Sequence, residues 1–134
     1  MDIQKRFAIQ VLEAANILTG VMEQKNPSYE EILEDLRIIS DVAGFKMIRI
    51  YDCSLNSEMI LSIIKEYKMD IKVMLGIWLR AELSNHHTCS WLNSPIPDDE
   101  LANNKKLNLE EIQSGIKLAN FYKDEVIAVN IGNE

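Results

Sequence analysis

The fold of this chain is decided by residues 126–134, which read Val-Ile-Ala-Val-Asn-Ile-Gly-Asn-Glu. Most of the first six residues are β-branched or small, and the four residues before them are polar. This pattern predicts a strand buried on both faces, as in a parallel sheet covered by helices. Asn133 and Glu134 would then follow at the carboxyl end of the strand, the edge where α/β proteins place their functional sites.

The clearest helix signal lies upstream, in residues 28–43. Ser28 and Glu31 have the spacing of a capping box, in which each side chain accepts a free backbone N–H of the first turn. Gly44 follows and suits the left-handed conformation that ends many helices. Apolar residues recur on one helical face: Ile32, Leu36, Ile39 and Ala43. Residues 5–22 carry a similar pattern, which predicts a helix or, over 17–21, a short strand.

Two further strands and a second helix follow. Apolar and β-branched residues dominate 47–52 and 71–78 and predict a strand in each. Between the two strands, Asn56 or Ser57 is expected to cap a helix. The apolar side chains of that helix are expected to share one face: Ile60, Ile63, Ile64 and Tyr67.

Residues 80–107 are mostly polar and include two prolines. A loop of this length in a compact domain is usually functional, so we expect an insertion beside a site. The third helix is expected to begin at Asn108, with Glu111 three residues later. Its inward face is predicted to carry apolar residues: Leu109, Ile112, Ile116 and Ala119.

Strands that alternate with helices form βαβ units and hence a parallel sheet. A complete (β/α)8 barrel needs eight strands and about 250 residues. The sequence therefore predicts an α/β fold, namely the N-terminal part of a (β/α)8 TIM barrel with about three to four βα units. We assign the partial barrel to residues 28–134, and residues 1–27 to an N-terminal helix or a degraded first strand. The chain is expected to be a fragment of a longer protein.

Composition excludes several classes of protein. The 134 residues are 47% hydrophobic and 26% charged, as in a globular domain. The net charge of -7 disfavours nucleic-acid binding, which uses clustered Lys and Arg. No apolar run reaches the ~20 residues that a membrane span needs, and the N-terminal segment lacks the cleavage pattern of a signal peptide.

Metal and cofactor sites are not expected. Cys53 and Cys89 lack zinc-site spacing and are read as free thiols. The adjacent His86 and His87 point apart in a strand and share a helix face poorly, so a solvated loop is expected there. The acidic residues 98–100 lack the spacing of a calcium loop. No Gly-rich nucleotide-binding motif follows any strand.

The carboxyl ends of the predicted strands carry the candidate site. In a parallel barrel, Tyr51, Trp78, Asn133 and Glu134 lie at one mouth. Aromatic rings stack on the apolar side of a pyranose, an amide holds a hydroxyl group, and a carboxylic acid protonates a glycosidic oxygen. These residue types together indicate a sugar site. Asp52 is interpreted as a turn or cap residue.

Five segments, in this order, carry a resemblance to a known family: Tyr29–Leu36, Gly44–Tyr51, Lys72–Trp78, Glu111-Ile112 with Gly115-Ile116, and Val129–Glu134. Over roughly residues 28–134 the sequence resembles glycoside hydrolase family 17, the β-1,3-glucanases. The resemblance implies a retaining enzyme that cleaves the O-glycosidic bonds of β-linked glucan by double displacement. It implies no cofactor.

The resemblance also assigns roles at the site. Glu134 corresponds to the acid/base glutamate, with Asn133 beside it, and Tyr51, Asn133 and Trp78 correspond to substrate-binding positions. The nucleophile of the family is a second glutamate near the end of the seventh strand, a region absent from these 134 residues. We therefore expect the chain by itself to be inactive. Residues 17–22 offer only a degraded version of the family's first strand.

Three alternatives remain open. The parent protein could be a β-1,3-glucan transglycosylase, which transfers the sugar to another sugar in place of water. The chain could instead be a non-catalytic α/β module that binds a ligand or partner at its strand ends. Exposed strand edges are also expected to allow self-association, including pairing of two half-barrels.

Overall fold

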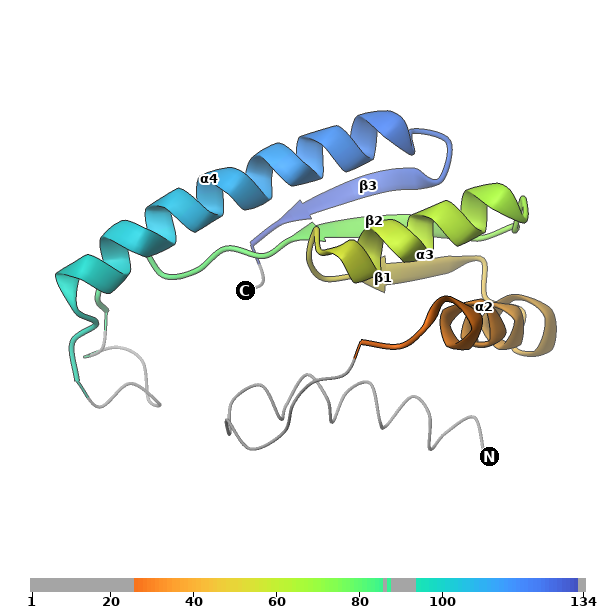
Figure 1. Ribbon diagram of the computed structural model, residues 1–134, viewed down its shortest axis with the longest axis horizontal. Helices are drawn as coiled ribbons and strands as arrows, with labels where there is room; N and C mark the ends of the chain where they lie inside the picture. The colour runs from red at the N-terminus through yellow and green to blue at the C-terminus, as the bar shows by residue number, and fades with distance from the viewer. Residues whose placement is uncertain (1–25, 86, 88–93, 133–134) are drawn as a thin grey trace.

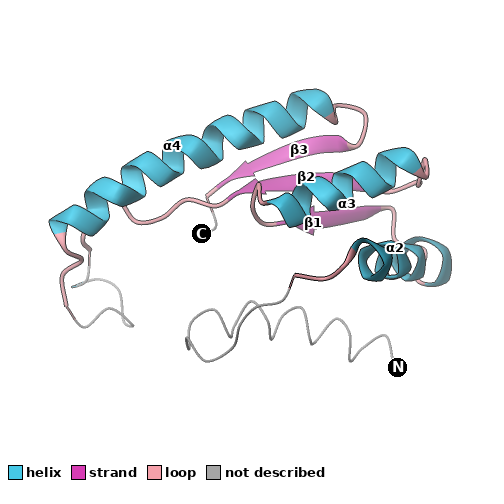
Figure 2. Cartoon of the chain, in the orientation of Figure 1, coloured by secondary structure: helices cyan, strands magenta, loops and turns pink. Residues whose placement is uncertain are grey.

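A computed structural model describes residues 26–85, 87 and 94–132, which form helices on a small sheet (Figures 1 and 2). In chain order the elements are α2 (Tyr29–Arg37), the π-helical turn η1 (Ile38–Val42), β1 (Met47–Ile50), α3 (Leu55–Glu66), β2 (Lys72–Ile77), α4 (Asp98–Phe121) and β3 (Val126–Ile131). The predictions made for residues 1–25, His86, Cys89, Asn133 and Glu134 lie outside the described residues.

The three strands form one parallel sheet in the order β1-β2-β3. The β1–β2 pairing extends to Ile50↔Leu75. The β2–β3 pairing extends to Ile77↔Ile131. Each connection between neighbouring strands contains a helix, α3 or α4 (Figure 1). The predicted α/β fold is confirmed, and this arrangement is consistent with part of a (β/α)8 barrel.

The core lies between the sheet and α3. The largest fully buried side chains come from α3, from β2 and from the residue before β2: Leu61, Ile63, Ile64, Ile71, Val73 and Leu75. Residues from α2 and α4 join the same cluster. Burial of this apolar surface stabilises the fold by about 25 cal/mol per Å². The apolar run predicted as the second strand forms β2, which lies between β1 and β3 in the sheet and supplies two of these buried side chains.

The capping box at the start of α2 is confirmed. The Ser28 N–H donates to Glu31 Oε2 over 2.8 Å, and the Glu31 N–H donates to Ser28 Oγ over 3.3 Å. Gly44 ends the segment with a φ of 71°, the left-handed conformation predicted for it. The prediction that Ala43 shares the face of Ile32 and Leu36 is wrong, because η1 fits more residues into each turn and leaves Ala43 exposed.

The second helix, α3, begins earlier than predicted. Its cap is Ser54, whose Oγ accepts the Ser57 N–H, and neither Asn56 nor Ser57 serves as the cap. Leu61, Ile63 and Ile64 are buried on its inner face. Tyr67 was expected on that face but is 43% exposed, because it lies at the helix end, and the Arg37 guanidinium lies 5.5 Å from the centre of its ring.

The third helix, α4, differs most from its prediction. It begins at Asp98, so the long loop expected over 80–107 is wrong and Asn108 lies inside the helix. Three acidic residues occupy its first turn, where their negative charges interact favourably with the positive end of the helix dipole. Hydropathy does not indicate a helix in this stretch, because its buried positions, Asn104 and Asn108, are polar. No described helix combines the length and hydropathy needed to cross a membrane.

The inner face of α4 was also misplaced. Leu109 and Ile116 were predicted to face inward but are 57% and 56% exposed. The buried positions are Asn104, Asn108, Gly115 and Leu118. Ala119 of the predicted face does pack against the core, and Ile112 is half-buried. Two amides and a glycine add nothing to a hydropathy pattern, so the apolar periodicity placed the inner face only in part.

The prediction that the last strand is buried on both faces is wrong. In β3, residues Ile127, Val129 and Ile131 are exposed, while the alternate residues are half-buried. β3 is the edge of the sheet in the described part of the chain, and no described element covers this face. Burial of a strand depends on its neighbours, which the strand's own residues do not specify.

Candidate functional site

The carboxyl ends of the three strands lie together at one edge of the sheet (Figure 1). Tyr51 follows β1 and is 56% exposed, and Trp78 follows β2 and is 44% exposed. At the end of β3, the Gly132 N–H donates to Ile77 O over 3.0 Å, directly beside Trp78. The structure therefore brings both predicted aromatic residues to the predicted edge. Asn133 and Glu134 lie outside the described residues.

Two local features shape the chain just before Asn133. The Asn130 side-chain amide donates to Gly132 O over 2.6 Å. Gly132 has a φ of 82°, a left-handed conformation that glycine adopts without strain. Both features belong to the bend at Gly132 that follows β3.

The exposed ring of Tyr51 packs against a cation. The guanidinium carbon of Arg49 lies 4.6 Å from the centre of this ring, within cation–π distance. The two residues are two positions apart at the end of β1 and so project to the same side of the strand. This contact restrains the ring while a large part of it stays accessible.

The turn after β1 is built on Asp52. Its Oδ1 accepts the Ser54 N–H over 3.1 Å and the Ser57 hydroxyl over 2.8 Å. This is the turn-and-cap role predicted for Asp52, and it links the end of β1 to the first turn of α3. The Asp52 carboxylate is thereby engaged in holding the backbone.

A carboxylate from α4 lies at the same edge, although the sequence predicted no role for it in the site. Glu111 Oε1 accepts the Cys53 N–H over 2.8 Å and the Trp78 N–H over 3.3 Å. One oxygen therefore joins the segment after β1 to the segment after β2.

Two glycines allow the elements to approach closely here. A Cβ on Gly115 of α4 would lie 2.6 Å from Ile77 Cδ1 and 3.2 Å from Cys53 Sγ. A Cβ on Gly76 would lie 2.6 Å from Tyr51 O, a backbone atom that cannot rotate away. Both positions therefore need a residue without a side chain.

Cys53 lies within this contact and is a free thiol. Its Sγ lies 3.4 Å from Gly76 O. Burial and then the charge of Glu111 raise the pKa of the Cys53 thiol to about 12. Because the thiolate is the reactive form, the protonated thiol is not a nucleophile near neutral pH.

The N-terminal half of α4 extends past the carboxyl edge of the sheet and holds the loop after β2 (Figure 1). The Asn108 side chain accepts the Arg80 N–H over 2.7 Å and donates to Arg80 O and Glu82 Oε1, each over 2.9 Å. One turn earlier, Asn104 donates to Ala81 O over 2.9 Å. These bonds hold the loop after Trp78 against α4.

The sequence contained a signal for this face. Asn104, Asn108, Glu111 and Gly115 recur at spacings of four, three and four residues, so they lie on one side of a helix. A polar stripe of this kind is normally read as solvated. Here it binds backbone groups that lack partners in the sheet.

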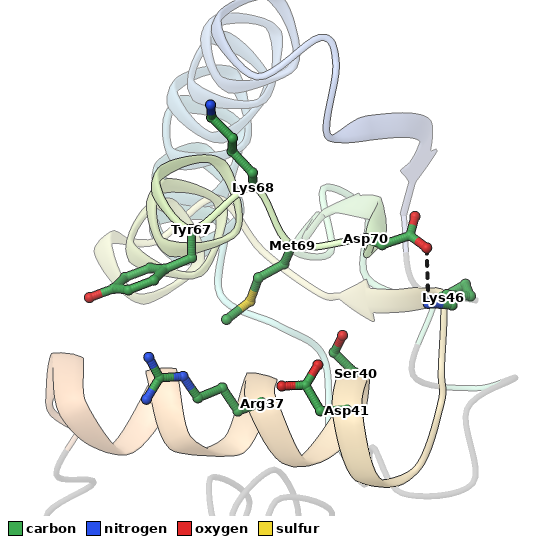
Figure 3. Close-up of a pocket in the computed structure, with 8 residues that line it drawn as sticks. All are labelled: Arg37, Ser40, Asp41, Lys46, Tyr67, Lys68, Met69 and Asp70. Carbon is green, nitrogen blue, oxygen red and sulfur yellow. Dashed lines mark ion pairs between the residues drawn. The ribbon is translucent and has the colours of Figure 1, made fainter.

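A depression of about 370 Å³ lies at the opposite edge of the sheet (Figure 3). It is lined by Arg37, Ser40, Asp41, Lys46, Tyr67, Lys68, Met69 and Asp70. Lys46 lies just before β1 and Asp70 lies two residues before β2. The two form an ion pair of 2.9 Å, and hydrogen bonding to Lys46 lowers the pKa of Asp70. Conserved chemistry in parallel barrels lies at the other edge, so this depression is separate from the candidate site.

No group of three potential metal ligands occurs among residues 26–85, 87 and 94–132.

Comparison with known proteins gives one informative likeness. No family model matches the chain, and no curated protein matches it. The structure is similar to that of an endo-laminarinase from Formosa Hel1_33_131, with a TM-score of 0.59 and 25% sequence identity. The likeness covers 81% of this chain and 26% of that one, so the chain spans about a quarter of the laminarinase's length. The chain therefore has a glucan-hydrolase-like fold.

Proposed function

We propose that this chain is the N-terminal part of a retaining β-glucan hydrolase of the glycoside hydrolase family 17 type. The observation that carries the proposal is the carboxyl edge of the sheet, where Tyr51 and Trp78 lie exposed beside the end of β3. The likeness to an endo-laminarinase supports a β-1,3-linked glucan as the substrate. Exposed aromatic rings at a parallel-sheet edge suit the apolar faces of glucose units.

In this proposal the end of β3 supplies the acid. Glu134 protonates the leaving oxygen of the glycosidic bond and then activates the water that releases the sugar. Asn133 holds a hydroxyl group of the sugar in the same subsite. Tyr51 and Trp78 stack on or flank the glucose units.

The proposal includes inactivity of the 134-residue chain by itself. A retaining enzyme needs a second carboxyl group about 5–5.5 Å from the acid, to attack the anomeric carbon. The described carboxylates nearest the edge bind other groups of the chain: Asp52 binds Ser54 and Ser57, Glu82 binds Asn108, and Glu111 binds two backbone amides. The nucleophile is therefore assigned to another part of the parent protein.

Binding of sugar tests the proposal. We expect the chain to bind laminarihexaose in isothermal titration calorimetry. Trp78→Ala should weaken binding by about fivefold, because the stacking of an aromatic ring on a sugar contributes on the order of 1 kcal/mol. Tyr67→Ala is the matched control, since Tyr67 is equally exposed but lies at the other edge of the sheet. Equal effects of the two substitutions would contradict the proposed site.

Turnover provides the second test. The chain and its Glu134→Gln variant are incubated with laminarin, and reducing ends are measured. We expect both to show the same background. Hydrolysis by the chain above that of the variant would contradict the assignment of the nucleophile to a different region.

A further inference from the structure

We propose that Glu111 is a positioning residue that fixes the spacing of Tyr51 and Trp78 for a glucan chain. This inference rests on the proposed function, because it gives Glu111 a role in the same site. Glu111 itself lies behind the strand ends on α4 and acts through the backbone of the two aromatic segments.

The first argument is the position of the two donors. The β1–β2 pairing ends at Ile50↔Leu75, and the β2–β3 pairing ends at Ile77↔Ile131. The N–H groups of Cys53 and Trp78 lie beyond these last pairs. Glu111 Oε1 is the acceptor for both, at 2.8 and 3.3 Å. A carboxylate accepts such bonds more strongly than a neutral group does.

The second argument is what the two donors carry. One belongs to Trp78 itself, and the other lies two residues after Tyr51. Because a single oxygen accepts both, it fixes the distance between the two backbone segments as well as the position of each. A sugar that contacts both rings needs that distance to be constant.

The third argument is that close packing of α4 at this point is built into the sequence. Gly115 lies one turn after Glu111, and a side chain there would overlap Ile77 and crowd Cys53. Without that approach the Glu111 carboxylate could not reach backbone groups of two strands. The same helix face continues to Asn108, which fixes the loop that follows Trp78.

Hydrogen exchange by NMR tests the positioning directly in the full chain. We expect Glu111→Ala to accelerate exchange of the Cys53 and Trp78 amides by about tenfold or more, because each loses a bond to a charged acceptor. Glu110→Ala is the control: Glu110 is adjacent and exposed, and its carboxylate lies 3.9 Å from the Lys106 ammonium. Glu111→Asp, which withdraws the carboxylate by one methylene group, gives the same readout if the alanine variant does not fold.

Laminarihexaose affinity separates positioning from general stability. We expect Glu111→Ala to weaken binding by about tenfold, and Glu111→Gln, which keeps an acceptor oxygen, to remain within about threefold of the original chain. Ile64→Val lowers stability through the core on α3 and should leave the affinity unchanged.

The outcomes are distinguishable. If the original chain binds laminarihexaose but Glu111→Ala binds equally well, or if Ile64→Val weakens binding as much, the positioning role is overturned. If amide exchange at Cys53 and Trp78 is the same in Glu111→Ala and Glu110→Ala, it is overturned as well. If the original chain binds no laminarihexaose, the proposed function fails, whatever the exchange data show.

Discussion

α3 and α4 cover the same sheet with opposite kinds of surface. The inner face of α3 is apolar, with Leu61 and Ile63 fully buried. The inner face of α4 is largely polar, and its buried Asn108 binds backbone groups of the loop after β2. The first contact is non-directional and depends on area. The second is directional and depends on particular donors and acceptors.

The difference separates stability from site geometry. α3 contributes fully buried apolar side chains to the core, whereas the polar face of α4 fixes the chain where the strands end. A substitution on α3 is therefore expected to change the free energy of unfolding. One on the inner face of α4 is expected to change the local order of the carboxyl edge.

The largest expected effect is on α3. Leu61→Ala leaves a cavity in the core and should lower the free energy of unfolding by about 2–5 kcal/mol. Leu109→Ala is the matched control, because Leu109 is 57% exposed on α4 and its truncation should cost no more than about 0.5 kcal/mol. Urea denaturation followed by circular dichroism measures both. Similar losses of unfolding free energy in the two variants would contradict the claim that α3 contributes more to stability through its buried face than the exposed side of α4 does.

An intermediate effect is expected at Asn108. Asn108→Ala removes three hydrogen bonds and leaves the Arg80 N–H without its acceptor, at a cost of about 1–3 kcal/mol. The loss should appear as faster amide exchange in residues 80–82. Asn103→Ala, on the exposed side of the same helix, should leave exchange there unchanged. Fast exchange at Arg80 in the original chain would contradict the predicted role.

The smallest expected effect is a pH dependence at Cys53. Burial and then the charge of Glu111 raise the pKa of the Cys53 thiol to about 12. The pKa of a cysteine in an unfolded chain is about 8.5. Between these values the folded state binds more protons than the unfolded state, so stability falls as the pH rises. In a Cys89→Ser background, Cys53→Ala should flatten the decline of the melting temperature between pH 8 and 10. Parallel declines with and without Cys53 would contradict this assignment.

The sequence predicted those elements whose own side chains determine their state. The capping box of α2 and the apolar run of β2 were identified correctly because each is a local pattern. The start of α4 was missed because Asn104 and Asn108 are buried by hydrogen bonding, which hydropathy does not register.

The site was predicted in part for the same reason. Parallel strands bring their ends to one edge, so the places of Tyr51 and Trp78 followed from the strand assignments alone. The contact of Glu111 with two backbone amides depends on how closely α4 approaches the sheet, which only the packing reveals. The exposure of β3 likewise depends on which elements lie beside it.

The most direct test of the account is an NMR titration of the chain with laminarihexaose, followed through backbone amide shifts. The account predicts that the largest shifts occur at the carboxyl edge of the sheet, in residues 51–53, 78–80 and 132–134. Largest shifts around Lys46 and Asp70 at the amino edge, or no shifts at millimolar sugar, would contradict it.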